Sequence, residues 1–266
     1  MIESLHDTVL THGLLQAWLA IFAILSARYL VIAGAAAVIW YGWRRRHAFS
    51  RKIQQRWPRF ADYRREVGYS FLTFTIFAAI ATLVLAGPLR PYTQIYSNVA
   101  DHGWGYFAAS LVAVLLLHDA YFYWVHRAMH HPSVYRWVHL THHRSTNPTP
   151  LAAFAFHPLE AGVIVLIAFL FPVHPGVILL FVLIMTLDNV YGHLGWELYP
   201  KGFQRHPIGR WINTSVSHNQ HHRHAAGNYG LYFLWWDRMC GTLRTDYDAA
   251  FDEVTSRDAA GPLPAA

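Results

Sequence analysis

The sequence predicts an all-α protein whose helices cross a membrane several times. The 266-residue chain is 54% hydrophobic and 16% aromatic but only 14% charged, whereas soluble domains carry roughly 25% charged residues. Its apolar residues form blocks long enough for membrane helices, which need about 20 residues. Most of the 19 histidines lie between His118 and His224. This composition excludes a disordered or collagen-like chain.

Four apolar blocks form the expected membrane part. In the first block, 14–43, the single charge of Arg28 is expected to mark a junction between an interfacial segment and a span. The second and third blocks, 69–87 and 104–125, each fit one span. Prolines divide the fourth block, 159–187, into two expected helices of about 13 residues, too short to span alone. We therefore expect about three spans plus a re-entrant or hairpin pair, in preference to buried core helices of a soluble protein.

The charges between the blocks predict the orientation in the membrane. Nine basic residues crowd the loop after the first block: Arg44, Arg45, Arg46, Arg51, Lys52, Arg56, Arg59, Arg64 and Arg65. The positive-inside rule places this loop, and with it the histidines, on the cytoplasmic side. No Lys or Arg precedes the first block, which we expect to be a retained anchor rather than a cleaved signal peptide. Topology thus explains the net charge of +6, and no nucleic-acid partner is expected.

The histidines recur with a spacing that predicts a metal site. The candidate ligands are His118, His126, His130, His139, His142, His143, His193, His218, His221 and His222. The first three share a helical face, and two stretches read H-x-x-H-H, in which positions three and four apart project to one side. Each H-x-x-H-H stretch is therefore expected to serve one centre. Neutral imidazoles suit iron, zinc or copper, and ten of them exceed the needs of one ion, so we expect two.

The single cysteine, Cys240, leaves thiolate zinc sites and iron–sulfur clusters without ligands. Other polar side chains are expected to surround the ligand rings: Asp119, Arg127, His157, Glu160, Asn189 and Asn219. Among these, Asp119 and Glu160 are candidate acceptors for ligand N–H groups, and Arg127 is expected to pair with one of them.

These motifs resemble the fatty acid hydroxylase / sterol desaturase superfamily of integral-membrane di-metal oxygenases. The resemblance rests on HDAYFYWVHRAMH (118–130), HLTHH (139–143), AFHPLE (155–160), HNQHH (218–222) and NYGLYFLWWDRMCGT (228–242). It implies one domain over 1–266, with a membrane anchor (1–116), a catalytic histidine-box region in a cytosolic helical cap (117–242) and a loose tail (243–266). Some relatives carry a histidine where this chain has Asn189, which makes His118 the alternative source of a tenth ligand.

The resemblance also implies the cofactors and partners. The expected cofactors are two iron ions, and zinc is the alternative metal in the protein as isolated. The expected partners are a membrane lipid, dioxygen and a separate electron-donor protein of the ferredoxin or cytochrome type. The expected reaction is hydroxylation of an unactivated C–H bond in a fatty acyl chain, a sterol-like lipid or another membrane lipid. Hydroxylation is preferred because it needs one hydrogen abstraction followed by rebound.

Other functions stay as alternatives. A desaturase of the same superfamily is the nearest, followed by a non-catalytic or zinc-dependent membrane metalloprotein. A zinc hydrolase would usually carry H-E-x-x-H, which the sequence lacks. A haem carrier would pair a few histidines at membrane depth, and a metal transporter would place polar residues along its spans.

Overall fold

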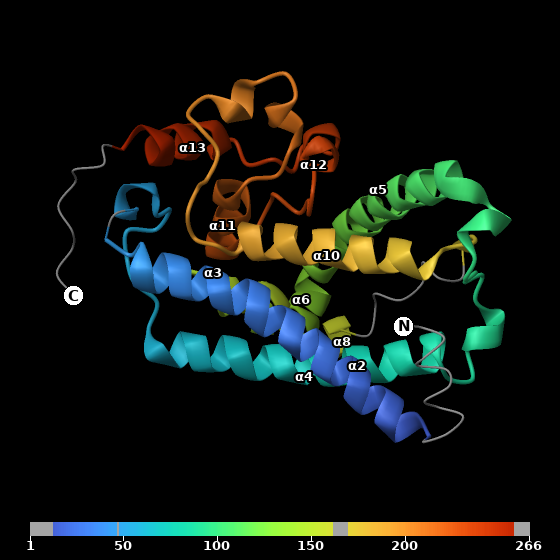
Figure 1. The fold of residues 1–266 in the computed structure, drawn as a ribbon. Helices are drawn as coiled ribbons and strands as arrows, with labels where there is room; N and C mark the ends of the chain where they lie inside the picture. Colours follow the sequence, from blue (N-terminus) through green and yellow to red (C-terminus); the bar gives the residue numbers. More distant parts are fainter. Residues whose placement is uncertain (1–12, 47, 162–169, 258–266) are drawn as a thin grey trace.

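The computed structural model describes residues 13–46, 48–161 and 170–257, and the regular elements in this part of the chain are helices (Figure 1). The predicted all-α class is confirmed. Four helices are long and apolar enough to cross a membrane: Leu14–Trp43, Phe60–Leu85 (α4), Gly103–Met129 (α5) and Pro175–Gly192 (α10). Only 22% to 33% of their most apolar windows is buried inside the protein. The outward-facing apolar side chains need a lipid environment, and the chain is an integral membrane protein.

The first block forms a single helix, and no break in the helix marks the position of Arg28. Leu14–Trp43 is one continuous helix. It contains α2 (Leu14–Tyr29), a π-helical turn at Leu30–Gly34, α3 (Ala35–Ala37) and a second π-helical turn at Val38–Trp43. The charge of Arg28 is accommodated within the helix, where its guanidinium lies 5.8 Å from the centre of the Phe154 ring.

The fourth block differs from its prediction in length. Its second helix, α10, has 18 residues and is therefore longer than the roughly 13 expected of a half-hairpin. The apolar block ends before Asp188, but the helix continues to Gly192, and the side-chain amide of Asn189 donates to the Ala153 carbonyl, 2.6 Å away. The expected first helix begins as α8 (Pro158–Ala161), and residues 162–169 lie outside the described part.

Two of the apolar clusters that hold the long helices together involve large side chains. One joins α2 to α4 and the segment before α8 through Tyr29, Phe74 and Phe154. The other lies between α5 and α10, where Val114 packs with Phe181. Shorter helices follow α5, namely α6 (Pro132–Val138) and α7 (Leu140–His143).

A cap of short helices sits at one end of the long ones (Figure 1). It contains α11 (Ser215–His224), α12 (Trp235–Met239) and α13 (Tyr247–Ser256). The prediction of a loose tail is wrong for α13, because its Tyr247, Phe251 and Val254 are buried against Val216 and Leu234. These three residues recur at helical spacing, which the Ala- and Asp-rich composition concealed. Residues 258–266 lie outside the described part.

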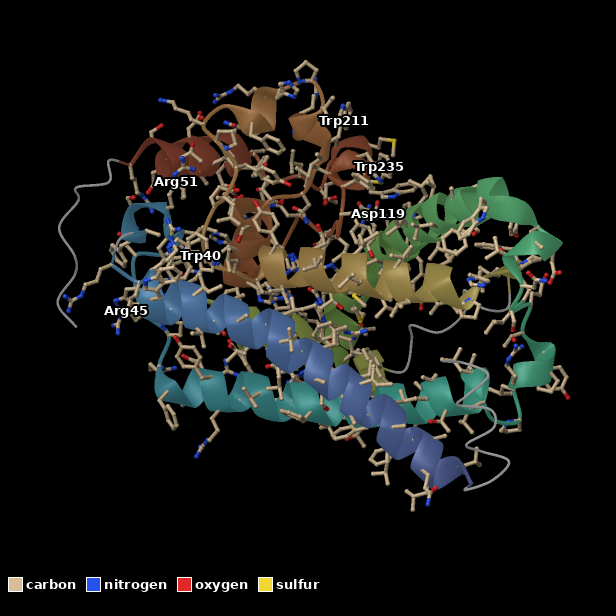
Figure 2. All side chains as sticks on the ribbon, viewed as in Figure 1. Trp40, Arg45, Arg51, Asp119, Trp211 and Trp235 are labelled. Carbon is tan, nitrogen blue, oxygen red and sulfur yellow. The ribbon has the colours of Figure 1, made fainter. Side chains whose placement is uncertain are left out.

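The basic loop after the first helix lies at the same end as the cap, where Arg45 and Arg51 are seen in Figure 2. The backbone amide of Ile53 donates to the Gly195 carbonyl at 2.9 Å, and the side-chain amide of Gln54 donates to the Thr146 carbonyl at 2.7 Å. The basic loop, which is predicted to be cytoplasmic, therefore contacts the histidine-bearing segments directly.

Candidate metal centre

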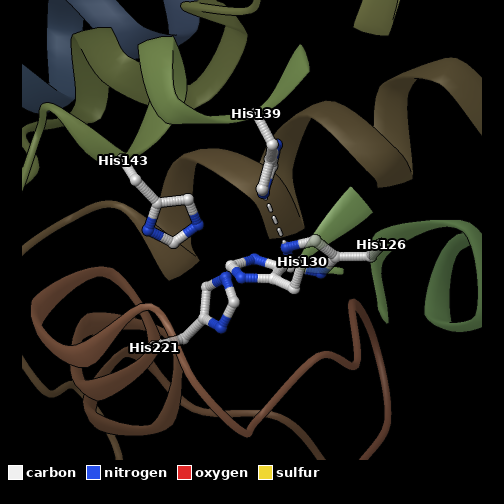
Figure 3. Close-up of side chains that lie close together, drawn as sticks. All are labelled: His126, His130, His139, His143 and His221. Atoms are coloured by element: carbon white, nitrogen blue, oxygen red, sulfur yellow. Dashed lines mark hydrogen bonds between the residues drawn. The ribbon is translucent and has the colours of Figure 1, made fainter. Parts of the chain in front are cut away.

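Nine of the ten candidate histidines converge in two groups. The five-histidine group contains His126, His130, His139, His143 and His221 (Figure 3). The four-histidine group contains His142, His193, His218 and His222. Within each group, the candidate ligand atoms all lie within 4.8 Å of one another.

Each H-x-x-H-H stretch divides between the two groups, which corrects the expectation of one centre per stretch. His139 and His143 turn to the five-histidine group, whereas His142 turns to the other. Consecutive residues of a helix point about 100° apart, so the last two histidines of such a stretch diverge. In α11, His221 and His222 diverge in the same way. This division holds the two groups side by side.

Backbone carbonyls fix five of the rings through Nδ1. The pairs are His126 with Tyr229 O (2.8 Å), His130 with Ala225 O (2.9 Å), His193 with Asn189 O (2.7 Å), His221 with Gly227 O (2.7 Å) and His222 with Ser145 O (3.1 Å). A carbonyl only accepts, so Nδ1 carries the proton and the Nε2 lone pair is left for a ligand. This arrangement is usual for metal-binding histidines.

The inward-facing Nε2 atoms crowd together. His193 Nε2 lies 3.1 Å from His222 Nε2, yet both rings use their protons on carbonyls, so neither can donate to the other. A shared cation explains the approach, because ligands about 2.1 Å from a metal lie roughly 3.0–3.4 Å apart. In the five-histidine group, the Nε2 atoms of His130, His143 and His221 are buried without a hydrogen-bond partner among the described residues. The donor set therefore fits two metal ions.

Burial keeps the rings neutral, which is the form that binds metal. Desolvation lowers the pKa of His130 and of His193 to about 4. Desolvation first, and then repulsion between neighbouring imidazoliums, holds the pKa well below its usual 6.5 for His139, His142, His143, His218, His221 and His222. These rings are consequently unprotonated on the metal side at pH 7.

Glu160 stands beside the site where an acceptor was expected. Its Oε1 lies 2.9 Å from His139 Nδ1, and both side chains are buried. Burial raises the pKa of the Glu160 carboxyl well above its usual range. Without a cation the pair is therefore neutral overall, and a cation on Nε2 of His139 would favour the ionised carboxylate.

His118 lies outside both groups. Its Nδ1 is 3.0 Å from the Tyr232 hydroxyl. The neighbouring Asp119 carboxylate accepts from the Tyr232 amide (3.0 Å), the Phe233 amide (3.3 Å) and Trp235 Nε1 (2.7 Å) (Figure 2). Asp119 therefore holds the segment before α12, in place of the ligand ring that the sequence suggested.

The remaining expected neighbours bond to other side chains or to the backbone. Arg127 donates to the Tyr123 hydroxyl at 3.2 Å instead of pairing with Asp119 or Glu160. His157 Nδ1 accepts from the Leu159 amide at 3.3 Å. Asn219 lies on the back of α11, where its Oδ1 accepts from Gln54 Nε2 at 2.8 Å. Asn189 acts through its carbonyl, which orients His193.

Two features of the site were not anticipated. The turn after α11 supplies two of the orienting carbonyls, and it uses left-handed backbone at Ala225, Gly227 and Asn228. A Cβ on Gly227 would come 2.8 Å from Thr242 O, so the A-A-G-N sequence is the signal for this turn. The Tyr229 ring packs against one side of the five-histidine group. Its centroid lies 5.1–5.7 Å from those of His126, His130 and His221.

Comparison with known proteins identifies the family of the chain. The family model for fatty acid hydroxylases matches residues 111–242. A Delta(7)-sterol 5(6)-desaturase of Gibberella zeae is 30% identical over 234 residues, which cover 82% of this chain and 69% of that protein. Human lathosterol oxidase is 29% identical over 206 residues, covering 75% of this chain and 64% of the relative. No solved structure gives a significant match. The chain belongs to the fatty acid hydroxylase / sterol desaturase superfamily, as its histidine motifs predicted.

Proposed function

We propose that this protein is a metal- and dioxygen-dependent oxidoreductase that oxidises unactivated C–H bonds of a sterol-like membrane lipid. The convergence of nine imidazoles into two adjacent groups carries the proposal. The relatives described above are named as a sterol desaturase and a lathosterol oxidase, so we place desaturation first. Hydroxylation, the expectation from sequence, is the second candidate, and the matching family model is the one named for fatty acid hydroxylases.

The two histidine groups would each hold one ion, and iron is the proposed metal. Bound there, a pair of irons would supply dioxygen reduction and hydrogen abstraction. The protein holds neutral rings in place through carbonyls and Glu160, and its ligands add no negative charge to the ions. Tyr229 on one group and Phe156, whose ring centroid lies 5.1 Å from that of His142, keep water away from the rings.

The electron balance requires a reductant. Desaturation converts dioxygen, two electrons, two protons and the two hydrogens of the lipid into two waters and an alkene. Hydroxylation uses the same two electrons and two protons and yields one water and an alcohol. The sequence has no G-x-G-x-x-G fingerprint for a nicotinamide cofactor, which supports a separate electron-donor protein. We place the metal centre on the cytoplasmic side, because it lies beside the basic loop.

Labelled dioxygen distinguishes the candidate reactions. Lipids from cells with and without the gene, grown under ¹⁸O₂, would be compared by mass spectrometry, with His142→Ala as the control that lacks a ligand. Desaturation gives a product lighter by two hydrogens without label, whereas hydroxylation gives a product with one ¹⁸O. A lipid profile unchanged by the gene, in cells where the protein retains both metals, would contradict the proposal and favour a non-catalytic or zinc-binding role.

A further inference from the structure

A polar pocket lies behind the metal centre, on the opposite face of α11. It has a volume of about 650 Å³ and is lined by α11, by α13 and by residues 53–56 of the basic loop. In α11, His218, His221 and His222 face the metal groups, whereas Val216, Asn219, Gln220 and Arg223 face the pocket. A helix is about 10 Å across, so one helix diameter separates the pocket from the metal ligands.

The pocket carries unbalanced positive charge. Its two carboxylates are already paired, Asp246 with Arg244 at 2.9 Å and Glu253 with Arg257 at 2.6 Å. Arg223 is exposed, and no ion pair joins it to any described residue. Among the described residues, the Arg56 guanidinium donates only to the neutral side chains of Gln54 and Thr146.

A third donor lies at the floor of the pocket. Asn219 lines it and is only 1% exposed, and its Nδ2 has no hydrogen-bond partner among the described residues. Guanidinium groups and an amide N–H are donors that match carboxylate oxygens. The pocket therefore fits an acidic partner.

We propose that this pocket is the docking site of an acidic electron-carrier protein, which places a carboxylate between Arg56 and Arg223. The inference rests on the proposed function, which needs two electrons from outside the chain. Docking here brings the carrier within one helix of the metal ligands. The positive charge also steers an acidic protein to this face, and salt weakens that attraction.

Charge reversal tests the proposal. The protein in lipid nanodiscs is titrated with two acidic probes, a plant-type two-iron ferredoxin and a cytochrome b5, at low and at physiological ionic strength. Arg223→Glu and Arg56→Glu are expected to weaken binding about tenfold or more and to flatten the salt dependence. The control Arg136→Glu changes the same charge on exposed α6 and is expected to change binding less than twofold.

Three results would overturn the docking site. One is equal binding by the Arg223 and Arg56 variants and the wild type. Another is binding of neither probe by a wild type that turns over with a chemical reductant. The third is several-fold tighter binding after deletion of residues 258–266, which would assign the pocket to the chain's own terminus. Metal content and turnover with the chemical reductant, measured on the same samples, report separately on the proposed function.

Discussion

At the residue scale, the nine imidazoles differ in what holds their second nitrogen. Carbonyl oxygens hold five of them, whereas His139 faces the carboxyl of Glu160 at 2.9 Å. Only the carboxyl can become negatively charged when a cation binds. Glu160 is therefore the neighbour through which the protein would offset part of the positive charge of bound metals.

Replacing Glu160 by glutamine keeps the size of the side chain and removes its ability to ionise. We expect Glu160→Gln to weaken metal binding about 10- to 100-fold, measured as the metal retained after dialysis against graded chelator. The control Glu253→Gln removes an exposed carboxylate of α13 and is expected to retain metal like the wild type. Equal retention by both variants would show that Glu160 has no influence on the ligands.

The lowered histidine pKa values predict how the metal-free protein responds to pH. Unfolding raises these values to about 6.5, so the unfolded chain binds more protons below that pH and the free energy of unfolding falls as the pH falls. For His130 and His193 the loss extends down to about pH 4. Melting temperatures of chelated protein should drop between pH 7.5 and 5.5, and metal-loaded protein should drop less. A pH-independent melting temperature of the chelated form would contradict neutral burial of the rings.

At the element scale, the sequence predicted which segments are helical better than where their side chains point. The H-x-x-H-H spacing identified α7 and α11, but it could not show that neighbouring histidines serve different groups, because that depends on how the two helices face each other. His118 shares the helical face of His126, yet it lies two turns away on α5 and meets Tyr232 instead. Asp119 likewise finds backbone amides of a segment more than a hundred residues later.

The helix α13 is the element that the sequence missed, and its packing can be tested. Phe251 is fully buried against the cap core. We expect Phe251→Ala to lower the free energy of unfolding by about 3–5 kcal/mol, measured by denaturation in detergent. Met239→Ala, a change at a side chain that is 67% exposed on the cap, should change it by less than about 0.5 kcal/mol. Similar small effects of both would mean that α13 does not pack as described.

At the scale of the whole molecule, the long apolar helices and the basic loop together predict the orientation in the membrane. Three of the four long helices could be anticipated because apolar block length is a local property of the sequence, whereas the fourth, α10, was expected to be too short to span. The contact of the loop with the cap could not be anticipated, since it joins Gln54 to Thr146 and Asn219 across the fold. This contact places the predicted cytoplasmic loop and the metal centre on one side.

Thiol labelling tests that orientation in intact cells. In a Cys240→Ser background, Ser97→Cys introduces a thiol in the loop between α4 and α5, and Ser50→Cys introduces one in the basic loop. We expect an impermeant reagent added outside to label the first variant, and to label the second only after the membrane is opened. Labelling of the Ser50→Cys variant in intact cells would place the metal centre on the outer side.

The metal content of the purified protein tests the central claim most directly. The account predicts two ions per chain for the wild type and for His118→Phe, because His118 lies in neither group. His142→Ala removes a ligand of the four-histidine group, and His221→Ala removes one of the five-histidine group. Each substitution should reduce the metal content toward one ion. A wild type that binds a single ion, or alanine variants that keep both, would contradict the two-group metal centre.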